Sequence, residues 1–336
     1  MPQITFNQAK DFLNNISEKD KVAIIHHDDG DGFCAGILYY DWCKKQKAIV
    51  KQFTYEIGKT KLRNFNLDEF NKFIITDIAP HLISEDLELI KENQILFTDH
   101  HQRDTPIPKE IQELVTVDQG YIPSSRTAGE LTNLKPWLSL TGTITDAADL
   151  YPENENFIEE HLKEIHMNLD EFKENISSTI TNTITYFDKK TEEVFQILEK
   201  INSVEEIKTL KQYSEPVENE IQKFIEEYEE RKERLGNVNY YYFKPSFSIK
   251  AAVSGIISRN NNNEVFIFAT PKKDIDMISM SARSQNRAKD VSELLKAGVE
   301  GLENAKAGGH KAAAGGIIQA KDLEQFKQNM RDFQER

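Results

Sequence analysis

The segment HHDDGDG, residues 26–32, follows the apolar run at residues 22–25 and carries five ionisable side chains in its first six positions. Asp and Gly are ordinary turn residues, but a turn needs only one or two of them. Carboxylates this close repel one another unless a positive charge lies among them. Asp29 and Asp31 flank Gly30, so a tight backbone can direct both carboxylates to one point. The segment therefore predicts a cation-binding loop.

Similar side chains follow three further apolar runs. Asp77 follows residues 73–76, Asp99 with His100 and His101 follows residues 95–98, and Asp118 follows residues 114–117. Because the carboxyl ends of parallel strands meet at one edge of a sheet, we expect these groups to converge. Asp146, in the segment TGTITDAAD (residues 141–149), is expected to lie with these groups, because Gly142 permits close approach of the backbone.

The ligand set at this edge contains carboxylates and imidazoles but no thiolate. Such a set suits Mn²⁺ or a similar divalent ion better than it suits a structural zinc site. Four or more negative charges at one sheet edge also need metal charge to offset them. Two ions that share one carboxylate would use this number of ligands, and such pairs hydrolyse phosphate esters.

The surrounding sequence predicts an α/β fold. Residues 1–150 alternate short apolar runs with amphipathic stretches, as in a parallel sheet with helices, and the predicted strands are residues 22–25, 73–76, 95–98 and 114–117. Residues 151–235 have helical periodicity. Their last part, SEPVENEIQKFIEEYEERKERLG, predicts a connecting helix with Ser214 as N-cap, Pro216 in its first turn and Gly236 as its stop.

A second, smaller α/β domain follows, with predicted strands at residues 240–243, 265–269 and 277–281. We therefore expect a catalytic domain at residues 1–213, of which residues 150–213 are helical. A connecting helix at residues 214–235 and a substrate-binding domain at residues 236–336 complete the chain. The active site is expected in the cleft between the two domains.

Composition narrows the class of protein. The 336 residues suffice for two domains that each bury a core. The sequence has no apolar run near the ~18 residues of a membrane span and no signal-peptide pattern. Its two cysteines, Cys34 and Cys43, provide neither a disulfide framework nor a CxxC metal site, and Cys34 is expected to be a buried free thiol. These features predict a cytoplasmic protein with no membrane partner.

The net charge of −14 argues at first against a nucleic-acid ligand, but the charge is uneven. Residues 151–235 carry 22 Asp and Glu against 11 Lys and Arg, whereas residues 236–311 carry 11 basic and 7 acidic residues. The C-terminal part can therefore meet a phosphate backbone. The acidic helical segment is expected to be a solvated face, with a partner surface as the alternative.

Taken together, the motifs have the pattern of a known family. HHDDGDG, ITDIAP (residues 75–80), FTDHH (residues 97–101) and TGTITDAAD resemble, in order and spacing, the four motifs of the DHH phosphoesterase superfamily. GGHKAAAGG, residues 308–316, resembles the signature of the DHHA1 domain in the RecJ-like exonuclease and oligoribonuclease (nanoRNase) branches. SMSARS, residues 279–284, resembles the serine–arginine strand that precedes it. The resemblance covers nearly the whole chain, with residues 151–235 matched by position only.

This resemblance implies a two-metal site with Asp77 as the bridging carboxylate. One ion would be held by His27, Asp29 and Asp77, and the other by Asp31, Asp77, His100 and Asp146. His101 would face the scissile phosphate, Asp99 would orient a histidine from behind, and a water between the ions would be the nucleophile. The spacing of the archaeal RecJ-like branch selects His27 as the first ligand, and His26 is the alternative.

In the C-terminal domain the resemblance implies binding of a phosphate or a nucleotide end. The residues implied are Arg283, Ser281, His310 and the backbone of Gly308 and Gly309. A guanidinium forks onto phosphate oxygens, and glycines let backbone N–H groups approach an anion. Arg126, in SSRTAGE, would also reach the substrate if Ser124 or Ser125 opens a helix whose N-terminus favours anions.

The resulting prediction is a Mn²⁺-dependent phosphodiesterase, with Mg²⁺ or Co²⁺ as alternative ions, that degrades single-stranded RNA, single-stranded DNA or short oligonucleotides from one end. A phosphatase acting on pAp or a phosphodiesterase acting on a cyclic dinucleotide is the alternative within the same class. A non-catalytic, Cdc45-like replication scaffold ranks below both, because every motif position is filled here. A replication or repair protein is an expected partner.

Overall fold

The computed structural model describes residues 5–101, 115–118, 121–272, 275–286 and 289–335 of the chain. Its contacts divide the chain into two compact units, Met1–Glu215 and Pro216–Arg336. Among the helices that these residues form, none combines the length and the apolar character that a membrane crossing requires.

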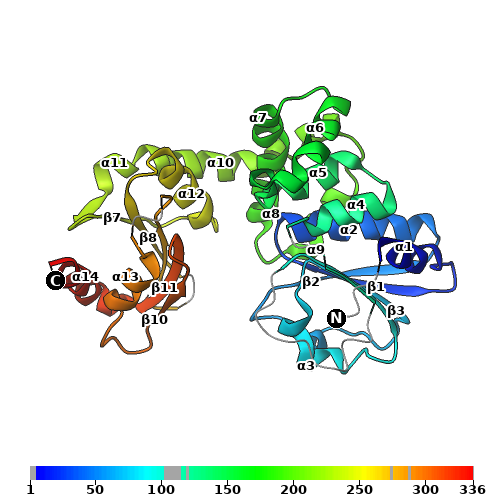
Figure 1. Cartoon of the computed structure of the whole chain (residues 1–336), viewed down its shortest axis with the longest axis horizontal. Coiled ribbons are helices and arrows are strands. Elements are labelled where there is room, and N and C mark those ends of the chain that lie inside the picture. The colour runs from blue at the N-terminus through cyan, green and yellow to red at the C-terminus, as the bar shows by residue number, and fades with distance from the viewer. Residues whose placement is uncertain (1–4, 102–114, 119–120, 273–274, 287–288, 336) are drawn as a thin grey trace. The chain divides into compact units, whose positions relative to one another are not determined.

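The N-terminal unit is built on a five-stranded parallel sheet with the order β2-β1-β3-β4-β5 (Figure 1). The strands are β1 (Lys21–His27), β2 (Ile49–Tyr55), β3 (Lys72–Thr76), β4 (Gln94–Asp99) and β5 (Val115–Asp118). Four of them correspond to the predicted apolar runs. The edge strand β2 was not predicted, because only its carboxyl-terminal residues are buried and its polar Lys51 and Gln52 interrupt the apolar pattern.

Helices cover this sheet on both faces. They are α1 (Phe6–Asn14), α2 (Gly30–Lys45), α3 (Ser84–Leu87), α4 (Ser124–Thr132), α5 (Pro136–Thr145), α6 (Glu155–Glu164), α7 (Leu169–Phe172), α8 (Ser178–Phe187) and α9 (Thr191–Glu199). Alternate strand residues face opposite cores. Val22 and Ile24 of β1 pack with α2 and α5, whereas Ala23 and Ile25 pack with residues 62–90.

The register of the parallel strands aligns their carboxyl ends. His26 of β1 lies opposite Thr76 of β3, which in turn lies opposite Thr98 of β4. The residues that follow these positions therefore leave the sheet at the same edge. This alignment is what allows loops that are far apart in sequence to form one site.

The C-terminal unit contains a six-stranded sheet with the order β10-β11-β9-β8-β7-β6. Its strands are β6 (Glu233–Leu235), β7 (Val238–Tyr242), β8 (Val265–Pro271), β9 (Met277–Arg283), β10 (Lys306–Gly309) and β11 (Ala313–Gln319). Among these described strands, β7 and β8 pair in parallel, and the other neighbours pair antiparallel. On one face lie α10 (Lys211–Glu226), α11 (Tyr228–Arg231) and α12 (Lys250–Asn260), and on the other lie α13 (Val291–Gly298) and α14 (Leu323–Glu335). This mixed α/β architecture agrees with the prediction.

The connecting helix differs from its prediction at both ends. The helix α10 begins at Lys211 and contains Pro216 in its interior, so Ser214 is not its N-cap. Residues 233–235 form β6, so the prediction of helix up to residue 235 was wrong there. Gly236, at a φ of +59°, occupies the turn between β6 and β7 instead of ending a helix. Leu235 explains the difference, because its side chain is buried in the core of the sheet.

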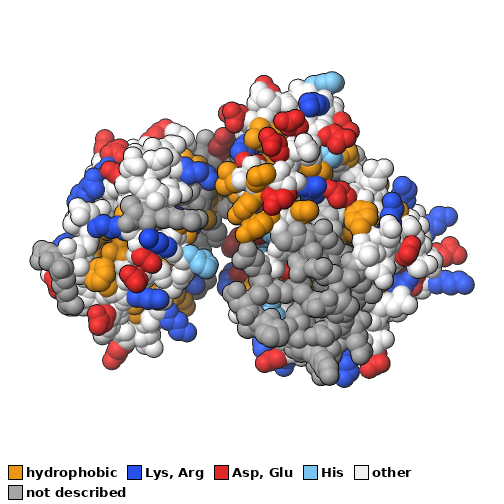
Figure 2. Space-filling view, viewed as in Figure 1, with side chains coloured by type: hydrophobic (Ala, Val, Ile, Leu, Met, Phe, Trp, Pro, Cys, Tyr) orange, Lys and Arg blue, Asp and Glu red, His pale blue; other side chains and the backbone are white. Residues whose placement is uncertain are grey.

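The acidic segment is helical, as predicted, and its glutamates face outward. Glu153, Glu155, Glu159, Glu160 and Glu164 are all exposed. On the face shown in Figure 2, acidic side chains are scattered among basic, hydrophobic and uncharged ones and do not gather into one patch. This distribution is that of a solvated face.

Candidate metal centre

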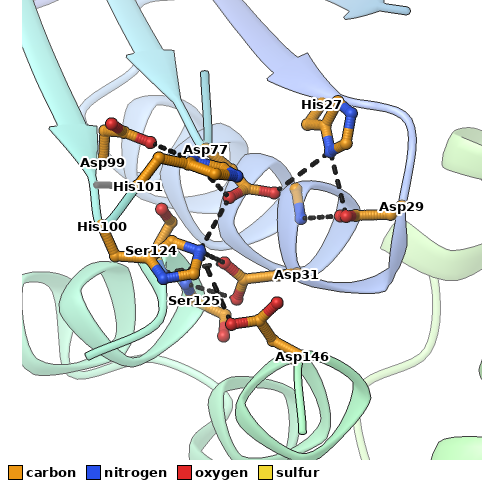
Figure 3. A network of polar contacts seen from close by, with 12 residues as sticks. His27, Asp29, Asp31, Asp77, Asp99, His100, His101, Ser124, Ser125 and Asp146 are labelled. Carbon is orange, nitrogen blue, oxygen red and sulfur yellow. Dashed lines mark hydrogen bonds and ion pairs between the residues drawn. The ribbon is translucent and has the colours of Figure 1, made fainter. Parts of the chain in front are cut away.

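The first part of the site is formed where β1 passes into α2. Asp29 is the N-cap of α2 and accepts a hydrogen bond of 3.0 Å from the backbone N–H of Gly32. A Cβ atom on Gly32 would lie 2.5 Å from the carbonyl oxygen of His27, so glycine is required for this tight turn. The turn brings Nδ1 of His27 to 2.9 Å from Oδ2 of Asp29 (Figure 3).

Asp77 lies at the centre of the site. It follows β3 with a φ of +60°, a left-handed conformation that Asp tolerates better than most residues. Its backbone N–H donates a hydrogen bond of 2.9 Å to the carbonyl oxygen of Thr98. The residue is only 1% exposed, and its carboxylate lies between two histidines. Its Oδ2 is 3.5 Å from Nδ1 of His27, and its Oδ1 is 3.3 Å from Nε2 of His100.

The second part of the site surrounds His100. Its Nε2 is 3.5 Å from Oδ2 of Asp146 and 3.9 Å from Oδ2 of Asp31. These side chains come from the end of β4, the end of α5 and the first turn of α2. The structure therefore brings together all six side chains that were expected as metal ligands: His27, Asp29, Asp31, Asp77, His100 and Asp146 (Figure 3).

The N-terminus of α4 holds Asp31 in place. The backbone N–H groups of Ser124 and Ser125 donate hydrogen bonds of 2.8 and 2.9 Å to its two carboxylate oxygens. A helix N-terminus favours a negative charge, so this contact stabilises the ionised form of a nearly inaccessible carboxylate. The sequence indicated that this helix start would attract an anion, and the anion it binds is a side chain of the protein.

Asp99 and His101 form a pair beside these ligands. Nδ1 of His101 lies 2.7 Å from Oδ1 of Asp99, and this hydrogen bond raises the pKa of His101. Asp99 is buried, whereas the side chain of His101 is 39% exposed. The pair thus presents an oriented imidazole at the surface of the site.

Electrostatic interactions in the site favour protonated histidines in the metal-free protein. Burial opposes a charge on His27, but the carboxylates of Asp29 and Asp77 outweigh it and raise the pKa of His27 to about 11. Burial is likewise outweighed at His100, where Asp77, Asp31 and Asp146 raise the pKa to about 10. Burial and the charge of Asp31 raise the pKa of Asp146 to about 7. A bound cation would replace these protons.

The polar atoms of the site fit a divalent ion. His27 with Asp29 and Asp77 forms one group of ligand atoms, and Asp77 with His100 and His101 forms another, each spanning no more than 4.8 Å. Within the described residues, the buried Nδ1 of His27 and Oδ2 of Asp77 lie at ion-pair distance from each other but make no well-aligned hydrogen bond. Coordination of an ion between them would satisfy both atoms.

The structure places His26 away from this cluster. Its ring is fully buried, 4.8 Å from the ring of Phe33 and 5.3 Å from that of Phe195. Its Nδ1 hydrogen-bonds the carbonyl oxygen of His27 at 2.7 Å. Burial lowers the pKa of His26 to about 4, so the ring is neutral. Of the two histidines, only His27 is positioned to reach the expected metal ligands.

Arg126 is also apart from the cluster, although we expected it to contact substrate. Its guanidinium donates hydrogen bonds to Glu130, to the carbonyl oxygen of Glu153 and to Asn154, each between 2.8 and 2.9 Å. It also lies 4.9 Å from the centre of the Phe157 ring. The side chain thus joins α4 to residues 153–157, and these internal partners engage its Nε and Nη1 groups.

The expected substrate residues of the C-terminal unit lie on three adjacent strands. Ser281 of β9 pairs with Gly315 of β11, which pairs with Gly308 of β10, so the three share one face of the sheet. Arg283 lies on the same face of β9 because it is two residues from Ser281. Gly309 and the exposed His310 lie at the β10–β11 turn, where Gly309 adopts a φ of +139°.

Comparison with known families supports this architecture. Residues 21–167 match the DHH family, N-terminal domain, and residues 238–336 match the DHHA1 domain. No curated protein sequence matches the chain.

Solved structures share the fold at low identity. RecJ from Thermus thermophilus, in complex with Mn²⁺, is 15% identical with a TM-score of 0.68 over 99% of this chain, which spans 55% of the length of that RecJ. An exonuclease RecJ bound to manganese is 17% identical with a TM-score of 0.70, over 100% of this chain and 96% of its own. The two matched domains occur in the order that the sequence motifs predict. The chain therefore belongs to the DHH/DHHA1 superfamily of metal-dependent phosphoesterases and has a RecJ-like fold.

Proposed function

We propose that this protein hydrolyses the phosphodiester bonds of single-stranded nucleic acid or short oligonucleotides from one end, with two divalent ions. Mn²⁺ is the expected ion, and Mg²⁺ or Co²⁺ would substitute. The observation that carries the proposal is the position of Asp77, whose two carboxylate oxygens face different histidines, His27 and His100. One carboxylate shared by two ligand groups is the arrangement that a two-ion centre requires.

The ligands divide around Asp77. His27, Asp29 and Asp77 would hold one ion, and Asp31, Asp77, His100 and Asp146 would hold the other. When bound, such ions neutralise phosphate charge and acidify water. The geometry around His101 supports a separate role. Its Nδ1 is 4.0 Å from Asp77, but its closest partner is Asp99 at 2.7 Å.

His101 is the residue best placed to act on the substrate. Its hydrogen bond to Asp99 fixes the ring and raises its pKa, so the imidazole is more often protonated at neutral pH. A protonated imidazole can donate a hydrogen bond to a phosphate oxygen or a proton to a leaving oxygen. Asp99 would act as a positioning residue, because it contacts the histidine and not the substrate.

Several observations favour a nucleic-acid substrate. RecJ, which shares this fold, is described as an exonuclease and has been observed with manganese. All the expected ligand positions are filled and assembled, which favours an enzyme over a non-catalytic scaffold. End recognition is expected from the DHHA1 domain, through Arg283, Ser281, Gly308, Gly309 and His310. The cytoplasmic location, the cleft between the domains and a replication or repair partner stay predictions.

The experiment that tests this function uses single-stranded RNA and DNA labelled at either the 5′ or the 3′ end. We expect Mn²⁺ to support release of mononucleotides from one end only, and EDTA or Asp77→Asn to abolish it. The same preparation is given pAp and cyclic dinucleotides. Cleavage of these small molecules without cleavage of either strand would overturn the oligonucleotide assignment. Internal cuts would overturn end recognition.

A further inference from the structure

Two tyrosines stack on each other at the surface of the N-terminal unit. The ring centres of Tyr121 and Tyr151 lie 4.4 Å apart, and the ring planes are nearly parallel, with an angle of 15° between them. Both residues are nevertheless exposed, Tyr121 by 44% and Tyr151 by 39%. Stacking covers only one face of each ring, so the pair still presents an outer face and ring edges to solvent. We call this pair the tyrosine platform.

The tyrosine platform is joined to the metal centre by short stretches of chain. Tyr151 follows Asp146 by five residues, which span at most about 18 Å. Tyr121 precedes Ser124 by three residues, which span at most about 11 Å, and the backbone N–H of Ser124 binds the carboxylate of Asp31. Both carboxylates belong to the same expected ion. The platform therefore lies no more than a few nucleotide lengths from a phosphate bound at that ion.

The backbone under the tyrosine platform is held by side chains of the fold. Nδ2 of the buried Asn154 donates hydrogen bonds of 3.3 Å to the carbonyl oxygen of Tyr121 and 3.0 Å to that of Ala148. Nζ of Lys173 lies 2.6 Å from Oδ2 of Asp149, in the same segment. The exposure of the rings is therefore built into the fold and does not come from a loose loop. A surface that is already fixed loses little conformational entropy when a ligand binds to it.

The tyrosine platform offers aromatic rings and not charges. Two cations on the elements that hold it, Arg126 and Lys173, already have carboxylate partners in Glu130 and Asp149. A phosphate binds best to charged donors, whereas a nucleobase binds to an aromatic ring through its π-face. The chemistry of the platform therefore suits a base of the strand and not its phosphates.

Tyr186 of α8 shows how an exposed tyrosine of this unit packs elsewhere. It is 39% exposed, as Tyr151 is, but its ring lies 5.4 Å from that of Phe187 and 5.5 Å from that of Tyr213, at angles of 72° and 51°. Such tilted contacts are ordinary in a hydrophobic cluster. The parallel rings of the tyrosine platform instead have the geometry in which a further flat ring adds to the stack.

We propose that Tyr121 and Tyr151 form a stacking surface for one nucleobase of the substrate strand, beside the ion expected at Asp31 and Asp146. The base lies on the outer face of the pair and extends the stack by one ring. Because every base has a π-face, this contact holds the strand without selecting its sequence. The identity of the ligand as a nucleic acid rests on the proposed function.

Calorimetric titration of the full chain with tetranucleotides tests the tyrosine platform. The probes are tetrathymidylate and tetrauridylate, each intact and with one base removed at a time while the sugar and phosphate remain. Ca²⁺ replaces Mn²⁺, because a larger ion with a looser ligand shell neutralises the carboxylates but supports turnover poorly.

Three variants are compared with the unaltered chain. Tyr151→Leu removes the ring and keeps an apolar side chain, whereas Tyr151→Phe keeps the ring and removes the hydroxyl group. Tyr186→Leu is the matched control, because Tyr186 is an equally exposed tyrosine of the same unit. Thermal unfolding verifies that all three variants fold.

We expect removal of one particular base to weaken binding to the unaltered chain by about five- to a hundredfold, the effect of losing one stack between a base and an aromatic ring. Tyr151→Leu should weaken binding of the intact tetranucleotide by a similar factor. Removal of that same base should then change the affinity of Tyr151→Leu by less than about twofold, because the two partners of one contact do not contribute independently. Tyr151→Phe and Tyr186→Leu should bind the intact tetranucleotide as the unaltered chain does.

Additive losses in Tyr151→Leu would show that the ring and the base do not touch, and would overturn the platform. Binding by Tyr151→Phe as weak as that by Tyr151→Leu would assign the effect to the hydroxyl group and overturn stacking. The platform would also be wrong if neither tetranucleotide bound to the unaltered chain, or if no single base mattered for binding.

Failure of the proposed function would look different. A chain that releases mononucleotides with Mn²⁺ but binds tetranucleotides independently of Tyr151 would contradict the platform alone. A chain that binds tetranucleotides through Tyr151 but cleaves neither RNA nor DNA would contradict the exonuclease proposal and leave the platform intact.

Discussion

His26 and His27 are adjacent in β1, yet only His27 lies against the carboxylates of the metal centre. Its Nδ1 is 2.9 Å from Asp29, whereas the ring of His26 packs between Phe33 and Phe195. Successive side chains of a strand point to opposite faces, so a shift of one residue exchanges an expected metal ligand for a core residue.

We expect His27→Ala to raise the Mn²⁺ concentration needed for activity by at least about tenfold, because a ligand is lost. His26→Ala should leave that concentration nearly unchanged. It should instead lower the free energy of unfolding by roughly 2–4 kcal/mol, because it opens a cavity in the core. Mn²⁺ titrations of activity and chemical denaturation of both variants measure the two effects. The reverse ranking would make His26 the ligand.

Asp77→Asn should abolish Mn²⁺ binding and hydrolysis while raising the stability of the metal-free protein. Burial, with the charges of Asp29 and Asp31, raises the pKa of Asp77, so its ionised form is unfavourable without a cation. Asn keeps the shape of the side chain and tolerates the left-handed conformation at this position.

Thermal unfolding with EDTA and with Mn²⁺ measures both consequences of Asp77→Asn. The variant should have the higher Tm in EDTA and no increase in Tm with Mn²⁺. Retained activity at saturating Mn²⁺ would remove Asp77 as the shared ligand.

The metal-free protein should lose stability as the pH rises from about 5 to 9. His27 and His100 have pKa values raised from 6.5 to about 11 and about 10, so the stability they contribute below pH 6.5 is lost as pH rises toward those values. The pKa of Asp146 is raised from 3.8 to about 7, so this residue also lowers the stability of the protein as the pH rises, over a lower pH range. Asp29, whose pKa is lowered, acts in the opposite direction, but only at acid pH.

Mn²⁺ should reverse this trend, because it competes with protons for the same ligands. The increase in Tm that Mn²⁺ produces should therefore grow with pH, and binding near neutral pH should release protons into the buffer. Calorimetry in buffers of different ionisation enthalpy measures the released protons. Binding without proton release would mean that the histidines are already neutral in the metal-free protein.

Asp99→Asn should shift the alkaline limb of the pH–rate profile to lower pH. The hydrogen bond from Asp99 raises the pKa of His101, so its loss should lower that pKa and deprotonate the imidazole earlier. Mn²⁺ affinity should change little, since Asp99 lies behind His101. A lower rate with an unshifted profile would show that Asp99 supports the local structure without tuning His101.

Much of the candidate site could be predicted from sequence because His27, Asp77 and His100 lie at or directly after the end of an apolar strand. Parallel strands must align their carboxyl ends, so the convergence of Asp77 and His100 follows from topology. The role of Ser124 and Ser125 did not follow, because their contact with Asp31 spans more than ninety residues and is made by backbone N–H groups. Nearly every residue type has a backbone N–H group, so residue types in the sequence do not show which of these groups will bind a carboxylate.

The strands of the C-terminal unit that the sequence failed to predict were missed for different physical reasons. In β10 and β11, glycines of GGHKAAAGG replace the β-branched residues that usually indicate a strand. In β6, the charged residues Glu233 and Arg234 do not indicate a strand, and only the buried side chain of Leu235 packs this short edge strand against the core.

Arg283 is expected to contribute to substrate recognition by the C-terminal domain. Arg283 lies on the face of β9 that carries Ser281, and its guanidinium has no carboxylate partner among the described residues. A charge-assisted contact between arginine and phosphate contributes about 1.5–3 kcal/mol. Arg283→Ala should therefore lower kcat/KM on oligonucleotides by about one to two orders of magnitude, with Mn²⁺ binding unchanged.

Cleavage of a minimal ester by Arg283→Ala distinguishes an effect on substrate recognition from an effect on the chemical step. Bis(p-nitrophenyl) phosphate lacks the flanking nucleotides that position a true substrate, so its cleavage should suffer less than that of an oligonucleotide. Both substrates are measured on the same preparation, with Lys321→Ala as the exposed-cation control. Equal losses on the two substrates would place Arg283 at the reacting phosphate. Unchanged cleavage of the oligonucleotide would exclude Arg283 from substrate recognition, because no step of the reaction would then depend on its charge.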